Sequence, residues 1–186
     1  MSARRTSADR RIQAVRSVQG PVRRVLMVCM GNICRSPTAE AVLRHRLQRA
    51  GLAGIDVDSA GTHAGHVGHQ PDDRAIAHAG RRGYELAHLR ARRVNSSDFE
   101  DFDLLVSMDD DNLESLQQIC PPELAHKLVL LLDFAPEAGQ PQVPDPYYGG
   151  PAGFERVLDL VEQGCDGLLQ YLQSQQGVDG GSPEIR

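Results

Sequence analysis

Short apolar runs alternate with longer amphipathic stretches along the chain. Four mainly apolar runs, typical of strands buried in a parallel sheet, occupy residues 25–28, 55–57, 102–108 and 127–133. Helices are expected over residues 36–50, 71–83, 110–119 and 154–172. This alternation predicts an α/β sandwich with a mostly parallel sheet of about four strands, right-handed crossovers and helices on both faces.

The ends of the expected helices carry their own signals. Apolar residues recur at i, i+3, i+4 and i+7 from Phe154 to Leu172, which is the clearest helical pattern in the chain. The first expected helix begins at Ser36, an N-cap candidate that is followed by Pro37 at the first helical position. A Pro-Pro pair at residues 121–122 ends the third helix.

The length of 186 residues fits one domain. We expect this domain to span residues 23–173, between a basic N-terminal arm at residues 1–22 and a flexible C-terminal tail at residues 174–186. Seven arginines and one aspartate give residues 1–24 a net charge of +6, so the remainder carries −11 within a total of −5. The arm lacks apolar periodicity and is expected to be disordered.

Charge and composition exclude several classes of partner. A domain with a net charge of −11 repels the phosphates of nucleic acid, so no nucleic-acid partner is expected. No run of about 18 apolar residues is present, so membrane insertion is not expected. The first twenty residues contain no apolar segment of the kind that secretory signals need. Four cysteines in such a chain predict reduced thiols and a cytoplasmic protein.

Candidate chemistry concentrates between the first strand and the first helix. A loop that wraps from a strand end onto a helix N-terminus can turn its N–H groups toward one anion. Arg35 adds a planar guanidinium that grips two oxygens of a phosphate, and Gly31 permits the backbone angles of such a loop. We therefore expect a phosphate-binding loop that comprises Met30, Gly31, Asn32, Ile33, Cys34 and Ser36 around Arg35.

Cys29 stands at the start of this loop. Helix N-termini and nearby arginines favour the thiolate form of a cysteine. A thiolate beside a phosphate site predicts covalent transfer of a phosphoryl group to sulfur. A small core residue at a strand end is the other interpretation of Cys29. The predicted strand–loop–helix context favours the first interpretation.

The segment VCMGNICRSPTAE, residues 28–40, resembles the signature of the low-molecular-weight protein tyrosine phosphatases of the bacterial type. Further matches at residues 58–62, 108–112 and 145–149 extend the resemblance over residues 23–172. It implies a flavodoxin-like three-layer fold, in which ligands bind at the carboxyl ends of parallel strands. It also implies hydrolysis of phosphotyrosine through a phosphocysteine intermediate, with no metal and no cofactor.

The resemblance assigns roles to individual residues. Cys29 is the nucleophile, and Arg35 binds the phosphoryl oxygens and stabilises the transition state. Asp145, which stands between two prolines, is the general acid that protonates the departing phenolate; a turn-forming Asp before Pro is the alternative. Ser36 can donate a hydrogen bond to the thiolate, and Asn32 fixes the shape of the loop.

The expected substrate cleft departs from the family pattern at one position. Many relatives have an aromatic residue where this chain has Gly65, and that ring forms a wall of the cleft. The loss either weakens the preference for a phenyl ring or leaves the wall to His66, Tyr147 or Tyr148.

Cys34 and a group of three histidines are two further candidates for chemistry. Cys34 lies in the same loop as Cys29 and is a candidate redox partner, because a nearby thiol can capture an oxidised cysteine as a disulfide. A small packing residue is the other interpretation of Cys34. His63, His66 and His69 have no acidic or cysteine partner at ligand spacing, so no metal site is expected.

Two other functions fit the same predicted fold. An arsenate reductase needs closely spaced additional cysteines, whereas Cys120 and Cys165 lie far apart. A phosphotyrosine-binding module without turnover would lack Cys29, Arg35 or Asp145, and all three are present. The expected partner is a phosphotyrosine protein, for which a bacterial tyrosine kinase is one candidate. The sequence leaves the oligomeric state open.

Overall fold

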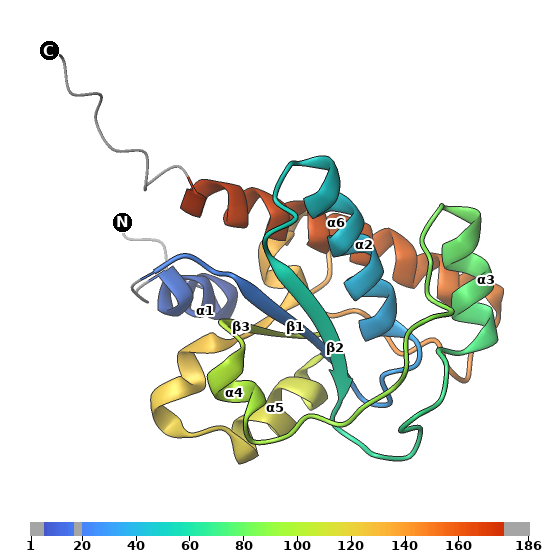
Figure 1. Ribbon diagram of the computed structural model, residues 1–186, viewed down its shortest axis with the longest axis horizontal. Coiled ribbons are helices and arrows are strands. Elements are labelled where there is room, and N and C mark those ends of the chain that lie inside the picture. Colours follow the sequence, from blue (N-terminus) through green and yellow to red (C-terminus); the bar gives the residue numbers. More distant parts are fainter. Residues whose placement is uncertain (1–5, 17–19, 177–186) are drawn as a thin grey trace, which may run out of the picture.

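A four-stranded parallel sheet with strand order β2-β1-β3-β4 lies at the centre of the molecule (Figure 1). A computed structural model describes residues 6–16 and 20–176. The strands are β1 (Arg24–Cys29), β2 (Asp56–Gly61), β3 (Leu104–Ser107) and β4 (Leu128–Leu130). The chain passes from β1 to β2 on one side and later crosses to β3 on the other. The carboxyl end of β1 is therefore a topological switch point, where α/β folds bind ligands.

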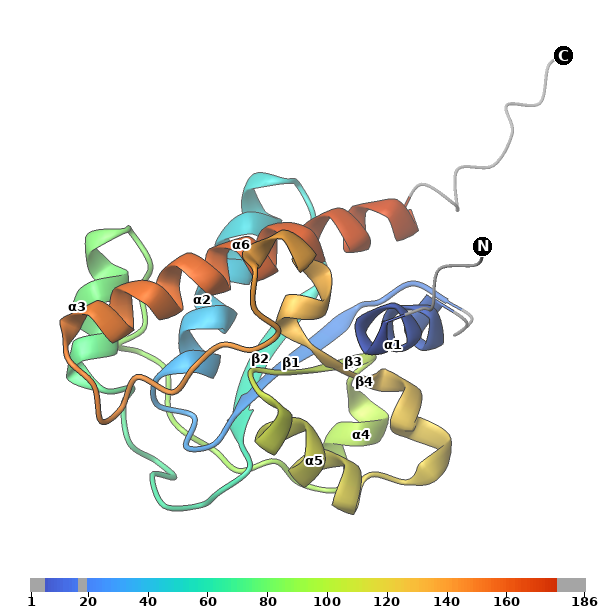
Figure 2. The ribbon, with the colours of Figure 1, turned by 180° about the vertical axis from the view of Figure 1, so that it is seen from behind.

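Helices cover both faces of the sheet (Figures 1 and 2). One face carries α2 (Arg35–Arg49), α3 (Asp73–Arg81) and α6 (Pro151–Gln176), and the other carries α4 (Asp98–Asp101) and α5 (Asp110–Ile119). Side chains of β1 alternate between the two cores, as the pleat of a strand requires. Val25 and Met27 belong to one core, and Leu26 and Val28 to the other. The predicted flavodoxin-like three-layer α/β fold is confirmed.

The apolar run at residues 127–133 is a strand only in part. β4 ends at Leu130, and the 3-10 helix η2 (Leu131–Phe134) follows it. The Leu130 N–H donates a hydrogen bond of 2.9 Å to the Asp133 carboxylate, which turns the chain out of the sheet. The neighbouring 3-10 helices, η1 (Pro122–Lys127) and η3 (Pro136–Ala138), both begin at a proline. An apolar run alone does not distinguish these short turns from a strand.

Part of the predicted N-terminal arm is helical. Residues 7–16 form α1 (Ser7–Arg16), so the expectation of a disordered extension is wrong for this stretch. Arg11 donates two hydrogen bonds, of 2.7 and 2.6 Å, to the carboxylate of Asp133, and Val15 is buried in the core. Tertiary contacts therefore stabilise a helix that the local pattern does not reveal. Residues 1–5 and 17–19 of the arm lie outside the described residues.

The long helix α6 follows the predicted apolar pattern and runs beyond it. The helix continues to Gln176, and so enters the predicted tail at residues 174–186. Residues 177–186 of that tail lie outside the described residues. Among the helices of the described ranges, none combines the length and the apolar character needed to cross a membrane.

Candidate active site

The loop between β1 and α2 has its carbonyl groups bound by neighbouring segments. The carbonyl oxygens of Cys29 and Met30 each accept a hydrogen bond of 3.0 Å from the segment after β2. The carbonyl of Ile33 accepts one of 2.8 Å from the N–H of Asp72. Within the described residues, the N–H groups of residues 30–34 donate no hydrogen bond to another backbone carbonyl. The loop therefore keeps its donors for an anion, as a phosphate cradle requires.

Asn32 holds the loop in shape. Its φ of +55° is a left-handed conformation that is uncommon for residues other than glycine. The side-chain amide nitrogen donates hydrogen bonds of 2.9 Å to the hydroxyl oxygens of Ser36 and Ser59. Its amide oxygen accepts one of 3.0 Å from the backbone N–H of Arg92. These three bonds offset the cost of the backbone conformation.

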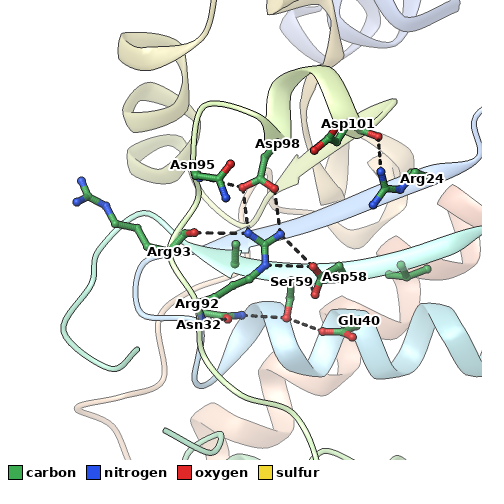
Figure 3. A network of polar contacts seen from close by, with 12 residues as sticks. Arg24, Asn32, Glu40, Asp58, Ser59, Arg92, Arg93, Asn95, Asp98 and Asp101 are labelled. Carbon is green, nitrogen blue, oxygen red and sulfur yellow. Dashed lines mark hydrogen bonds and ion pairs between the residues drawn. The ribbon is translucent and has the colours of Figure 1, made fainter. Parts of the chain in front are cut away.

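A polar network extends from Asn32 into the fold (Figure 3). Ser59 donates a hydrogen bond of 2.6 Å to the carboxylate of Glu40 on α2. Arg92 forms ion pairs with Asp58 at 2.9 Å and with Asp98 at 3.0 Å. Burial raises the pKa of Glu40, although the Ser59 hydroxyl opposes this shift. The network thus joins the loop to α2, to β2 and to the segment before α4.

The Cys29 thiol faces the hydroxyl of Ser36. The two atoms, Sγ and Oγ, lie 3.0 Å apart, and both side chains are buried. Ser36 Oγ accepts a hydrogen bond from Asn32, and its own hydrogen can be shared between Sγ at 3.0 Å and the Ala60 carbonyl at 3.5 Å. The predicted N-cap role of Ser36 is wrong, because α2 begins at Arg35 and Cys34 holds the N-cap position without a side-chain cap.

Arg35 lies at the first position of α2 and is 2% exposed. Its guanidinium bonds to the Asp109 carboxylate and donates a hydrogen bond of 3.0 Å to the Val143 carbonyl. Another of its nitrogens lies 3.5 Å from Asp145 Oδ2. Burial acts to lower the pKa of Arg35, but Cys29 and the two carboxylates outweigh it and raise the pKa overall. The guanidinium therefore stays charged inside the site.

Asp109 connects Arg35 to the N-terminus of α5. One carboxylate oxygen caps α5 by accepting a hydrogen bond of 2.8 Å from the N–H of Asn112, and the other accepts from Arg35. The preceding residue, Met108, accepts a hydrogen bond of 2.8 Å from the N–H of Val143. Asp109 therefore orients the guanidinium, and the Met108–Val143 bond brings the segment that carries Asp145 over the carboxyl end of β3.

Asp145 stands at the edge of the pocket, with its side chain 38% exposed. Its Oδ1 accepts a hydrogen bond of 3.1 Å from the N–H of Tyr147, and its Oδ2 faces Arg35. Prolines on both sides restrict the backbone at this position. The carboxyl group is thus held over the loop while it remains open to solvent.

A pocket of about 250 Å³ lies over the loop. Cys29 and Arg35, from the two ends of the β1–α2 loop, line it together with Asp145, which lies more than 100 residues later in the chain. The four residues predicted for the substrate cleft also line it, namely Gly65, His66, Tyr147 and Tyr148. Of the expected loop residues, Met30, Gly31, Ile33 and Cys34 face the pocket, whereas Asn32 and Ser36 support the loop from within.

Aromatic side chains form one wall of the pocket. The rings of Tyr147 and Tyr148 meet edge to face at 4.9 Å between centroids, and the ring of His66 lies 6.2 Å from that of Tyr147. A Cβ at Gly31 would lie only 3.0 Å from His66, so this glycine permits the close approach of the imidazole. By contrast, a Cβ at Gly65 would meet nothing within 4 Å, and the wall is open there.

Comparison with known proteins places the chain among enzymes that have this kind of site. A sequence model of the family described as low molecular weight phosphotyrosine protein phosphatase matches residues 24–178. The chain belongs to this family. The sequence prediction of a low-molecular-weight protein tyrosine phosphatase, a hydrolase, is confirmed.

Relatives of this phosphatase come from distant organisms. The low molecular weight protein-tyrosine-phosphatase of Streptomyces coelicolor is 45% identical over 156 residues, which are 82% of this chain and 94% of that protein. YfkJ of Bacillus subtilis, which bears the same description, is 39% identical over 82% of this chain and 97% of its own. A crystal structure of a protein tyrosine phosphatase from Entamoeba histolytica has a TM-score of 0.79 at 42% identity, covering 82% of this chain and 98% of its own.

The other thiols of the phosphatase differ from Cys29 in their surroundings. Burial raises the pKa of the Cys34 thiol, and the nearby carboxylate of Asp72 raises it further. Cys165 is buried on α6, and Cys120 is half-buried with its thiol near the Pro121 carbonyl. Among the described residues, no group of three or more histidines, cysteines or acids is placed to hold a metal ion.

The sequence patterns did not assign a role to several residues of the site. Asp109, Glu40 and Arg92 orient the arginine and the loop through contacts between distant segments. Asp109 had one local signal, since an aspartate directly before a helical segment is a typical N-cap. Glu40 lies among the apolar positions of α2, but that its charge is buried is seen only in the structure. Arg92 belongs to an Ala-Arg pair that is similar to one found in the family, but no local pattern indicated its contacts.

Proposed function

We propose that the phosphatase transfers the phosphoryl group of a phosphotyrosine side chain to Sγ of Cys29. The thiolate electron pair forms the S–P bond while the bond between phosphorus and the phenolic oxygen breaks. Asp145 gives its proton to that oxygen, so tyrosine leaves as a neutral phenol. The observation that carries this proposal is the single pocket lined by a buried cysteine, a buried arginine and a carboxyl group at the edge.

In the second step, water attacks the phosphorus of the phosphocysteine. Asp145 accepts a proton from this water, the S–P bond breaks, and inorganic phosphate leaves with Cys29 restored as a thiolate. The hydroxyl of Ser36, 3.0 Å from Sγ, stabilises the departing thiolate by a hydrogen bond. Arg35 and the N–H groups of the loop bind the phosphoryl oxygens and stabilise the charge of both transition states.

The shape of the pocket supports tyrosine as the substrate side chain. Cys29 is 2% exposed at its base, whereas the Tyr148 ring is 96% exposed at its mouth. A phosphate on a long, flat phenyl ring reaches such a base, while a phosphate on the short side chain of serine does not. The rings of His66 and Tyr147 offer apolar surface to the phenyl group.

The test is hydrolysis of p-nitrophenyl phosphate and of a phosphotyrosine peptide in the presence of EDTA. We expect turnover of both, no turnover of the matching phosphoserine peptide, and no turnover by Cys29→Ser. Cys120→Ser is the matched control, since its thiol lies outside the pocket lining, and it should retain full activity. Activity that Cys29→Ser retains, or that EDTA abolishes, would contradict the proposal.

We also propose that the substrate is a phosphotyrosine protein of the cytoplasm, and that a bacterial tyrosine kinase is one such protein. The bacterial relatives and the four free cysteines support this assignment. Asp145→Ala keeps the nucleophile and the loop but slows turnover, so it should retain bound phosphoprotein in a pull-down. Capture of a tyrosine kinase that wild-type enzyme then dephosphorylates supports the partner, and capture of other phosphoproteins alone would exclude it.

A further inference from the structure

A second hollow, of about 350 Å³, adjoins the catalytic pocket. His63 lines both hollows, so they are direct neighbours. The walls of the second hollow come from residues 62–64 after β2, from residues 93–94 and from the last two turns of α5. A peptide whose phosphotyrosine occupies the catalytic pocket therefore has its flanking residues next to this hollow.

The charge of the second hollow comes from Arg93. The neighbouring Arg92 is bound to two carboxylates, Asp58 and Asp98, and its charge is neutralised there. Figure 3 shows the Arg93 side chain pointing away from both carboxylates. Within the described part of the chain, the Arg93 guanidinium forms no ion pair or hydrogen bond, and no acidic side chain lines the hollow.

The remaining surface of the hollow is partly apolar. Val94 and Leu116 are buried beneath it, and Ile119 is 57% exposed at the end of α5. A ligand that complements both features has an aliphatic stem and an anionic end. A glutamate side chain has this composition, since two methylene groups separate its carboxylate from the backbone.

We infer that the hollow beside His63 is a subsite for an acidic residue that flanks the phosphotyrosine, with Arg93 as its cation. The inference rests on the proposed function and concerns which phosphoproteins the enzyme prefers. Three features of the hollow favour an acidic peptide: it adjoins the catalytic pocket, it has an unpaired guanidinium, and its floor is apolar. The overall negative charge of the domain makes such a local cation the main attraction for an acidic substrate.

The experiment measures kcat/KM for phosphotyrosine peptides in which one flanking position at a time carries glutamate or its neutral isostere glutamine. For wild type we expect one or two flanking positions at which glutamate is preferred about 2- to 5-fold, the range of an exposed ion pair. Arg93→Glu should abolish or reverse that preference. Turnover of p-nitrophenyl phosphate, which has no flanking residue, should stay the same.

Arg49→Glu provides a matched change of net charge. Arg49 is exposed in the last turn of α2, at the opposite end of that helix from the catalytic loop. This variant should keep the wild-type preference for glutamate at the same ionic strength. The preference should also fall as salt is added, because an exposed pair is screened.

Several results would overturn the subsite. These are equal kcat/KM for glutamate and glutamine at every position, a preference that persists in Arg93→Glu, and an equal loss in Arg49→Glu. Loss of p-nitrophenyl phosphate turnover in Arg93→Glu would show that this residue supports the catalytic pocket instead. Failure of the proposed function is distinct, because wild-type enzyme would then not hydrolyse any of the peptides.

Discussion

Asp145 has one carboxylate oxygen bound to the backbone and the other turned toward Arg35. A general acid needs this combination of a fixed position and access to the leaving group. Asp145→Asn keeps the shape of the side chain but removes its proton, so kcat for phenyl phosphate should fall by roughly 10²–10⁴. The loss should shrink for substrates whose phenols are more acidic. A series of aryl phosphates measures this trend, and an equal loss for all of them would make Asp145 a structural residue.

Gly65 leaves the aromatic wall of the pocket open. Space exists for a side chain there, so Gly65→Trp should add one ring contact worth up to about 1 kcal/mol, which is about a fivefold gain in affinity. The inhibition constant of benzylphosphonate measures the gain, and inorganic phosphate, which has no ring, should bind as before. Gly65→Ala controls for the loss of glycine. Unchanged benzylphosphonate binding would show that His66, Tyr147 and Tyr148 already supply the whole wall.

Cys34 is a proposed partner of Cys29 under oxidation. Peroxide converts the Cys29 thiolate to a sulfenic acid; the Cys34 sulfur then attacks that sulfur, a disulfide forms, and water leaves. Because burial raises the pKa of the Cys34 thiol, its thiolate is scarce at neutral pH. Formation of the bridge should therefore accelerate as pH rises.

Recovery after peroxide tests this role of Cys34. Wild type should regain activity in dithiothreitol, whereas Cys34→Ser should remain largely inactive, because its Cys29 oxidises beyond the sulfenic acid. Cys120→Ser should behave as wild type, and inorganic phosphate should protect all three forms by filling the loop. Peptide mass mapping identifies the bridge. Equal recovery of wild type and Cys34→Ser, with no Cys29–Cys34 bridge, would rule out the redox role.

At the scale of elements, α1 is attached to the fold by the Arg11–Asp133 ion pair and by the buried side chain of Val15. Arg11 neutralises Asp133, whose side chain is 3% exposed and also receives the N–H of Leu130. Arg11→Ala leaves this carboxylate without its cation, so the free energy of unfolding should fall by about 1–3 kcal/mol. Urea unfolding measures the loss, with exposed Arg49→Ala as the control. Unchanged stability, or a loss of p-nitrophenyl phosphate turnover, would contradict a purely structural role for α1.

The same elements show how far sequence patterns reach. The buried strands follow from short apolar runs, and α6 follows from apolar side chains that repeat at helical spacing. The helix α1 does not, because Arg11 and Asp133 are 122 residues apart and only the folded chain brings them together. The contacts of Ser36 differ from its local pattern for the same reason. A serine before a proline is a typical N-cap by local rules, but its hydroxyl bonds instead to Cys29 and Asn32.

At the scale of the whole molecule, the strand order determines where the site lies. Cys29 ends β1 between β2 and β3, so the segments after all three strands converge on one loop. Sequence motifs identified Cys29, Arg35 and Asp145, because their neighbours along the chain are distinctive. The contacts among these residues and their neighbours could not be predicted in this way, because they depend on the order of the strands in the sheet. Asp109, for example, reaches Arg35 only because β3 pairs with β1.

The convergence of these segments on Cys29 makes one claim central, namely that its sulfur carries the phosphoryl group during turnover. Rapid quenching of a reaction with p-nitrophenyl phosphate in EDTA, followed by peptide mass mapping, measures this directly. We expect the mass of one phosphoryl group on the peptide that contains Cys29 and none in Cys29→Ser. We also expect a burst of about one equivalent of p-nitrophenol when hydrolysis of the intermediate is the slow step. A phosphoryl group on another residue, or a burst with unmodified Cys29, would contradict the account.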